Sequence, residues 1–214
     1  MVAHALSEPT RWALLQALMA GPSSVSALVR GLGLSPTNGS NHLGVLRAAG
    51  LVSAKRRGRV VEYAIASPAA AQLIESLSVL SGPAGARART ELAEARTCYD
   101  HLAGRLGVAL FEQLRRAGAL ASAPSGRTIT LGRNADRIYA RLGVAIDQLV
   151  PTRRRLAYAC LDWTERRPHL GGAVGAAIAQ EFIRRRLVRR RHGSRGLDVS
   201  PAAWRLVASL GERA

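Results

Sequence analysis

Two cysteines and two histidines stand at related positions in the C-terminal part of the chain, and an aspartate follows each cysteine by two residues. Two thiolates and two imidazoles form a ligand set that suits a tetrahedral zinc ion. Asp100 and Asp162 are candidates to orient the imidazole rings from behind. The sequence therefore predicts a site for zinc or another transition metal, formed by Cys98, His101, Cys160 and His169.

Other interpretations of these residues stay open. A buried cysteine is commonly just a small hydrophobic side chain. A histidine can simply pack or cap a helix, and an accessible thiol can respond to oxidants. An organic effector is a further alternative, bound in a pocket between two units and lined by aromatic residues, namely Tyr99, Phe111, Tyr158 and Trp163. Metal binding, redox sensing, effector binding and purely structural roles are all compatible with the sequence.

The chain repeats itself around these residues. Residues 101–143 align without a gap with residues 169–211, and the identical pairs include glycines, arginines and a histidine. Chance rarely preserves such residues together. The residue pattern of each copy predicts a helix, then a hairpin with its turn near Gly126 or Gly193, and then a closing helix. This is the order of elements at the end of a winged-helix unit.

The thiols and imidazoles are expected to meet through this repeat. A long helix is expected from about Thr90. Cys98 and His101 are three residues apart, so on such a helix they share a face. The second copy carries six extra residues, 163–168, ahead of its histidine. Two pseudo-symmetric copies would each bring one thiol and one imidazole to a common point.

The first 80 residues predict three short helices and a hairpin. The helices are expected between Pro9 and Gly21, from Ser24 to Gly33, and from Ser35 to Gly50, because apolar residues recur there at helical spacing between caps and breakers. The hairpin should rise over residues 51–54, turn over 55–59 and return over 60–65. A further helix over residues 67–80 closes the unit. This order describes a winged helix-turn-helix, whose third helix enters the major groove of DNA.

Residues able to contact DNA cluster on the third helix and at the hairpin tip. Short polar side chains can reach base edges, and arginines bind phosphate. Serine and asparagine also cap helices, turn arginines are often only solvated, and the histidine can instead pack against the domain. The candidate DNA-binding residues are Ser35, Thr37, Asn38, Ser40, Asn41, His42, Arg47, Arg56, Arg57 and Arg59. Gly39 lies inside this helix, where it is expected either to let the helix approach DNA closely or to make the helix flexible.

Residues 6–11, LSEPTR, and residues 34–52, LSPTNGSNHLGVLRAAGLV, closely resemble the ArsR/SmtB family of bacterial repressors. The resemblance covers about the first 80 residues. It implies a homodimer, often built through the first and last helices of the domain, which a bound metal or another signal releases from double-stranded operator DNA. Many members carry a Cys-x-Cys pair where residues 23–28 read SSVSAL, and the closing helix offers only Glu75. The resemblance therefore implies a signal site elsewhere, in the repeated half.

The charge of the chain favours a polyanionic partner. Thirty-one Lys and Arg residues against 14 Asp and Glu residues give a net charge of +17 at pH 7, which suits nucleic acid. Of these, 24 basic and 11 acidic residues lie in residues 81–214, including six arginines within residues 184–191. A nucleoid-like or architectural DNA-binding protein is therefore the alternative to a regulator. Without a signal peptide or an apolar stretch near the roughly 20 residues of a membrane span, a cytoplasmic location and no membrane partner are expected.

The expected fold is mainly α with short β-hairpins, an α+β class. A winged helix-turn-helix over residues 1–80 and a linker over 81–89 precede a duplicated, winged-helix-like effector or dimerisation domain over 90–214. The sequence holds no Gly-rich phosphate loop, no His-Glu-x-x-His and no Gly-x-Ser-x-Gly, so no enzyme is expected. The predicted function is a homodimeric, sequence-specific repressor of transcription, controlled by a metal ion or a small-molecule effector.

Overall fold

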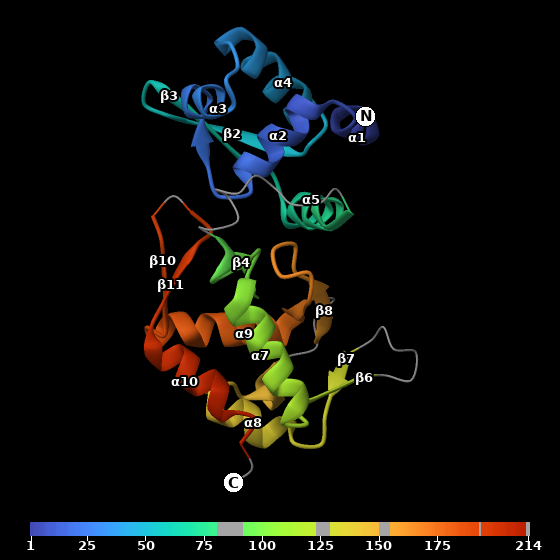
Figure 1. Ribbon diagram of the computed structural model, residues 1–214, viewed down its shortest axis with the longest axis vertical. Coiled ribbons are helices and arrows are strands. Elements are labelled where there is room, and N and C mark those ends of the chain that lie inside the picture. The colour runs from blue at the N-terminus through green and yellow to red at the C-terminus, as the bar shows by residue number, and fades with distance from the viewer. Residues whose placement is uncertain (81–91, 123–128, 150–154, 193, 213–214) are drawn as a thin grey trace. The chain divides into compact units, whose positions relative to one another are not determined.

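The computed structural model describes residues 1–80, 92–122, 129–149, 155–192 and 194–212, which belong to two compact units (Figure 1). The first unit is Met1–Ala88 with His192–Arg195, and the second is Arg89–Arg191 with Gly196–Ala214. Short helices and antiparallel hairpins make up both, which confirms the expected fold class. The linker expected over residues 81–89 lies outside the described residues, and the domain boundaries stay a prediction.

Helices with local start and stop signals form most of the first unit. Ser24 and Ser35 are N-caps, since their hydroxyl oxygens accept hydrogen bonds from the backbone N–H groups of Ala27 and Asn38. Gly33 ends a helix with a φ of +66°. The expected helices are confirmed, and a short first helix is added. They are α1 (Val2–Leu6), α2 (Pro9–Leu18), α3 (Val25–Leu32), α4 (Pro36–Ala48) and α5 (Pro68–Leu80).

The hairpin of the first unit is longer and its turn tighter than expected. Strands β2 (Val52–Arg57) and β3 (Val60–Ile65) pair antiparallel, with Arg57 opposite Val60, and β1 (Ser23–Ser24) pairs with the other edge of β3. Only Gly58 and Arg59 form the turn, because the φ of +61° at Gly58 allows a two-residue connection. The prediction of a turn over residues 55–59 is therefore wrong, and residues 55–57 extend β2.

Helices α2, α3 and α4 pack together around buried leucines, and Gly39 serves this packing. A Cβ at Gly39 would lie 2.2 Å from Cγ1 of Val29 on α3. The glycine therefore lets α3 and α4 approach each other, which corrects the expectation that it serves DNA approach or flexibility. The buried hydrophobic cluster includes Leu14, Leu15, Leu18, Leu28, Leu43, Leu46 and Ile74.

The second unit contains the repeat as two copies of the same order of elements. Each copy has a short hairpin, a helix, a second hairpin and a closing helix, which confirms the helix–hairpin–helix expectation and adds a leading hairpin. The turns expected near Gly126 and Gly193 lie outside the described residues. The first copy is β4 (Arg96–Cys98), β5 (His101–Ala103), α7 (Gly104–Arg116), β6 (Leu120–Ser122), β7 (Ile129–Leu131) and α8 (Ala135–Leu142). After η1 (Ile146–Gln148), the second is β8 (Tyr158–Leu161), β9 (Pro168–Gly171), α9 (Gly172–Arg184), β10 (Val188–Arg190), β11 (Leu197–Val199) and α10 (Pro201–Ser209).

The long helix expected from about Thr90 is wrong. Thr90 itself lies outside the described residues, and from Leu92 onward only residues 92 and 93 are helical before β4 begins. Pairing between β4 and β5 takes the place of the helix. Such pairing depends on tertiary packing that local periodicity does not report.

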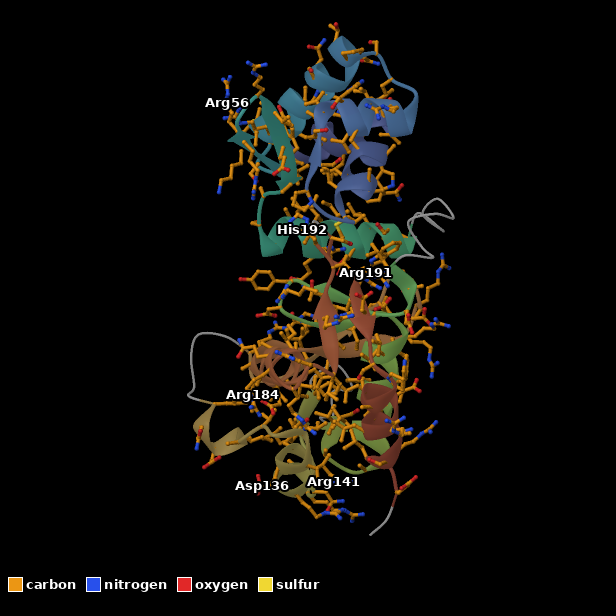
Figure 2. All side chains as sticks on the ribbon, turned by 90° about the vertical axis from the view of Figure 1, so that its left-hand side faces the viewer. Arg56, Asp136, Arg141, Arg184, Arg191 and His192 are labelled. Atoms are coloured by element: carbon orange, nitrogen blue, oxygen red, sulfur yellow. The ribbon has the colours of Figure 1, made fainter. Side chains whose placement is uncertain are left out.

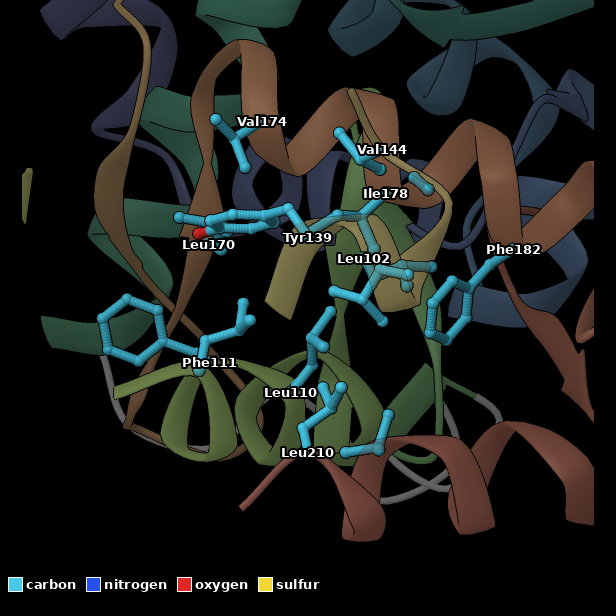
Figure 3. Packing of buried hydrophobic residues seen from close by; sticks show 14 of the residues in the cluster. Leu102, Leu110, Phe111, Tyr139, Val144, Leu170, Val174, Ile178, Phe182 and Leu210 are labelled. Atoms are coloured by element: carbon cyan, nitrogen blue, oxygen red, sulfur yellow. The ribbon is translucent and has the colours of Figure 1, made fainter. Parts of the chain in front are cut away.

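The two copies are interleaved around one core. Helix α7 packs against β9 of the other copy, and α9 packs against β5. Gly107 and Gly175 stand at matching positions of the two helices, where a Cβ would lie 2.4 Å from the carbonyl oxygen of Leu102 and 2.3 Å from that of Leu170. Each glycine therefore lets its helix lie against the preceding strand of its own copy. Figure 3 shows the common core, to which both copies contribute Leu102, Phe111, Tyr139, Leu170, Ile178, Phe182 and Leu210. Among the described helices, none has the length and apolar character needed to cross a membrane.

Candidate functional site

The four candidate metal ligands meet in the second unit. The Sγ atoms of Cys98 and Cys160 are 4.0 Å apart, and the Nε2 atoms of His101 and His169 are 3.2 Å apart. All four side chains are buried, and their ligand atoms lie within 4.8 Å of one another. We call these four residues the Cys/His cluster. The structure brings them together as the repeat indicated, and metal binding stays a prediction.

Strand pairing, rather than a helix face, positions the cluster. Cys98 lies opposite His101 in the register of β4 and β5, and Cys160 lies opposite His169 in that of β8 and β9. The expectation that Cys98 and His101 share a helix is therefore corrected. A two-residue turn joins β4 to β5, with Tyr99 at a φ of +60°. Directly opposed side chains of an antiparallel pair are neighbours on one face, so each hairpin presents one thiol beside one imidazole.

A carboxylate stands behind each imidazole. Nδ1 of His101 lies 3.3 Å from Oδ1 of Asp100. Nδ1 of His169 lies 3.1 Å from Oδ2 of Asp162, which is ion-pair range, although the angle is not that of a hydrogen bond. Both aspartates thus stand where the sequence predicted orienting groups, and both Nε2 atoms face the centre of the cluster.

The two carboxylates differ in how firmly they are held. Asp162 is fully buried, and its Oδ1 accepts hydrogen bonds from Arg96 Nη2 at 2.9 Å and from Thr164 Oγ1 at 2.7 Å. Its Oδ2 accepts the backbone N–H of Gly104 at 2.7 Å. Asp100 lies in the two-residue turn between β4 and β5, with its side chain 27% exposed. The half of the cluster from the second copy therefore has the more rigid support.

Arg96 is a functional candidate that sequence reasoning missed. Its side chain is fully buried, donates to the carbonyl oxygen of Leu92 and to Thr164, and lies with Cζ 5.0 Å from the ring centroid of Trp163. A single arginine among 29 others carries no local signal of such burial. The two copies place Arg96 and Asp162 together across 66 residues.

Burial and hydrogen bonding act in opposite directions on the ionisable groups of the cluster. Burial alone would lower the pKa of His169, but the Asp162 carboxylate and the Cys98 thiol raise it to about 9. Burial likewise opposes the charged form of His101, whose pKa is nevertheless raised by hydrogen bonds with Asp100 and Cys98. Burial would raise the pKa of Asp162, yet His169, Arg96 and the Gly104 N–H hold it well below its usual range.

A polar surface on the first unit holds most of the candidate DNA-binding residues. Ser35, Thr37, Asn38, Ser40, Asn41 and Arg47 are exposed on α4 or at its start, while Leu43 and Leu46 on the opposite side are buried. Ser35 is also the N-cap, so part of its hydrogen-bonding capacity is used. His42 is half-buried, and its Nδ1 lies 3.5 Å from Oε2 of Glu8. His42 thus faces the domain.

The basic hairpin carries its arginines on the surface. Figure 2 shows Arg56 on β2, directed away from the body of the first unit. Arg57 pairs with Glu62 at 2.7 Å across the hairpin, and Arg59 is exposed in the turn. In the second unit, two members of the arginine run, Arg184 and Arg191 (labelled in Figure 2), are locally neutralised, since Arg184 pairs with Glu181 and Arg191 with Asp198.

The aromatic residues expected to line one effector pocket do not face a common space. Phe111 is packed in the core, and Tyr99 is 57% exposed. Tyr158 lines a different cavity of about 800 Å³, together with Ile129, Leu131 and Leu156 among other residues. The expectation that these aromatic residues line one effector pocket is therefore wrong.

The first unit has the architecture of a winged helix-turn-helix, with an exposed polar third helix and a basic hairpin, which defines a class of DNA-binding proteins. A family model described as a helix-turn-helix domain matches residues 6–53. The chain is 31% identical over 208 residues to YdfF of Bacillus subtilis (strain 168), an uncharacterized HTH-type transcriptional regulator. That match covers 93% of this chain and 90% of YdfF.

Two further similarities are shorter. The HTH-type transcriptional regulator CmtR of Mycobacterium tuberculosis (strain ATCC 25618 / H37Rv) is 43% identical over 74 residues, which cover 35% of this chain and 63% of CmtR. The homodimeric winged helix-turn-helix domain of Mb0332 from Mycobacterium bovis, a possible ArsR-family transcriptional regulator, is 32% identical, with a TM-score of 0.37. That match covers 37% of this chain and 74% of the Mb0332 domain. The chain belongs to the ArsR/SmtB family of helix-turn-helix transcriptional regulators.

Proposed function

We propose that this protein is a homodimeric, sequence-specific repressor that reads double-stranded operator DNA through α4 and binds the DNA backbone through the β2–β3 hairpin. The main support for this proposal is that α4 has one buried apolar face and one exposed polar face. Its inner face packs on the core through Leu43 and Leu46, and its outer face offers short hydrogen-bonding side chains to a partner. Such side chains match the donors and acceptors on base edges in the major groove.

Different residues of this surface take different roles. Asn38 and Asn41 suit bidentate contacts to adenine, and Thr37 and Ser40 suit bases or phosphate. Arg47, at the far end of α4, and the hairpin arginines Arg56, Arg57 and Arg59 supply affinity that depends on salt rather than on sequence. His42 acts mainly by packing, because it faces Glu8.

The control of DNA binding is assigned to the second unit, as an effector or dimerisation domain over residues 90–214. The first unit offers no ligand set in the positions that the resemblance singles out, since residues 23–28 carry only serines and apolar residues and α5 carries only Glu75. The buried Cys/His cluster supports control by a metal ion or another effector in the second unit. Because DNA is the partner, the protein acts in the cytoplasm, and its role is regulatory rather than catalytic.

A nucleoid-like DNA-binding role is the second candidate, and the excess of arginine outside the first unit favours it. Footprinting of the full chain on genomic fragments that include its own promoter region separates the two. A repressor protects a discrete, two-fold symmetric site, whereas an architectural protein covers DNA uniformly. Uniform coverage at all protein concentrations contradicts the repressor proposal.

A further inference from the structure

The ligand atoms of the Cys/His cluster lie close to the separations that a tetrahedral ion imposes. With metal–sulfur bonds of about 2.3 Å and metal–nitrogen bonds of about 2.0–2.1 Å, neighbouring ligand atoms of a tetrahedron are about 3.3–3.8 Å apart. In the cluster the two Sγ atoms are 4.0 Å apart, the two Nε2 atoms are 3.2 Å apart, and all four ligand atoms lie within 4.8 Å of one another. A single ion can therefore reach all four atoms after small side-chain adjustments.

The imidazole rings of His101 and His169 need a positive charge between their Nε2 atoms. Asp100 and Asp162 stand at the Nδ1 atoms of His101 and His169, so the neutral rings keep their protons there. Each Nε2 then directs a lone pair toward the centre. Two neutral rings of this tautomer cannot hydrogen-bond through Nε2 atoms 3.2 Å apart, so a cation lies between them, either a proton on one ring or a metal ion. The two thiols beside the rings favour the metal ion.

We propose that Cys98, His101, Cys160 and His169 together bind one divalent ion of the zinc class, which has a closed d shell and prefers tetrahedral sulfur and nitrogen ligands. Two thiolates neutralise the ion, and Arg96 neutralises Asp162 behind the site. This inference rests on the proposed function in one respect, because it names the effector of the control site in the second unit.

The ion ties the two copies of the repeat together. Each copy supplies one sulfur and one nitrogen, from positions 62 and 68 residues apart. All four positions of a tetrahedron are thereby filled by protein, which is the arrangement of a held ion rather than of a catalytic one with an open position. Since α7 and α9 each pack on the hairpin of the other copy, occupancy of the site acts on how the copies pack.

Titration of the full chain with Co²⁺, after treatment with a chelator, tests the ion and its geometry. We expect one Co²⁺ per chain, with the strong visible bands of tetrahedral coordination and a sulfur-to-cobalt charge-transfer band, and complete displacement by Zn²⁺. Cys98→Ser and Cys160→Ser should each remove about half of the charge-transfer intensity and lower Zn²⁺ affinity by more than the roughly 10–100-fold typical of an outer-shell change. His4→Gln, at an exposed histidine outside the cluster, is the matched control and should bind as the parent does.

The outcomes separate this inference from its alternatives. No uptake of Co²⁺ or Zn²⁺ by the parent protein means that a proton, not a metal, lies between the imidazoles, and overturns the proposal. A weak octahedral spectrum, or uptake unchanged in both serine variants, overturns it as well. If circular dichroism shows that a serine variant is unfolded, the charge-transfer intensity of the parent protein still tests the proposal. That intensity reports how many thiolates are bound to the cobalt ion.

Control of DNA binding is measured on the same samples, by fluorescence anisotropy with DNA that the protein selects from a random library. An ion that binds in the expected geometry without changing DNA affinity supports the metal site and contradicts metal control in the proposed function. DNA affinity that responds to Zn²⁺ equally in the parent and in both serine variants places the responding ion elsewhere and overturns the assignment of the Cys/His cluster as the effector site.

Discussion

His101 and His169 face each other through their Nε2 atoms at 3.2 Å, although 68 residues separate them in the chain. This pair stands at equivalent positions of the repeat, with one carboxylate behind each ring. Duplication of one hairpin thus creates a site that neither copy contains alone. The same relationship holds for the two thiols, and it makes the centre of the second unit the place where the two copies are joined.

The asparagines of α4 are expected to carry sequence preference. Replacing Asn38 and Asn41 by alanine removes amides able to pair with base edges, each worth about 1–3 kcal/mol of discrimination. Competition binding with matched and mismatched DNA should show a smaller specificity ratio and little loss of nonspecific affinity. Gln148→Ala, which removes an exposed amide from the second unit, should leave the ratio unchanged. Full retention of preference in the double variant means that α4 is not the reading helix.

The hairpin arginines are expected to bind backbone rather than bases. Arg57→Ala and Arg59→Ala should weaken binding to all DNA sequences alike and reduce the salt slope by about one each. Affinity measured across a range of salt concentrations provides the check. Arg133→Ala is the control, because it removes an exposed charge from the second unit. An equal effect of that control supports the architectural alternative instead.

Asp162 is expected to be essential to the stability of the second unit. Asp162→Asn leaves the buried Arg96 guanidinium without its counter-charge, and such losses cost about 3–5 kcal/mol. Urea unfolding followed by circular dichroism should show a clearly lower midpoint. Asp100→Asn, at a partly exposed carboxylate, should cost about 1 kcal/mol or less. Equal midpoints for the two variants would show that the Arg96–Asp162 pair is not important for stability.

Two glycines of α4 are expected to respond to alanine in opposite directions. A Cβ at Gly39 meets Val29 Cγ1 at 2.2 Å, so Gly39→Ala should destabilise the first unit by about 1–3 kcal/mol. Nothing lies within 4 Å of a Cβ at Gly44, so Gly44→Ala should stabilise the helix by about 0.5–1 kcal/mol. Thermal unfolding measures both.

A second-site change checks that Val29 is the cause. Adding Val29→Ala to Gly39→Ala should recover part of the lost stability, because it removes the methyl group that the new Cβ meets. Equal melting temperatures for the Gly39 and Gly44 variants contradict the packing role of Gly39.

Sequence reasoning predicted the first unit well because its signals are local. Helices α2, α3 and α4 follow apolar periodicity, with N-caps at Glu8, Ser24 and Ser35, and the family resemblance rests on the same stretch. The main error in the first unit was the number of residues in the hairpin turn. Its two-residue form depends on the left-handed backbone of Gly58, and several turn lengths suit the same residues.

In the second unit the sequence determined which residues would matter, since the repeat singled out Cys98, His101, Cys160 and His169 by matched positions and residue types. Only the tertiary structure decided how they meet, as opposed pairs on two hairpins instead of along a helix. It also decided that one arginine, Arg96, lies buried against Asp162. The physical reason is that strand pairing and buried ion pairs join residues far apart in the chain, whereas caps and periodicity act within a few residues.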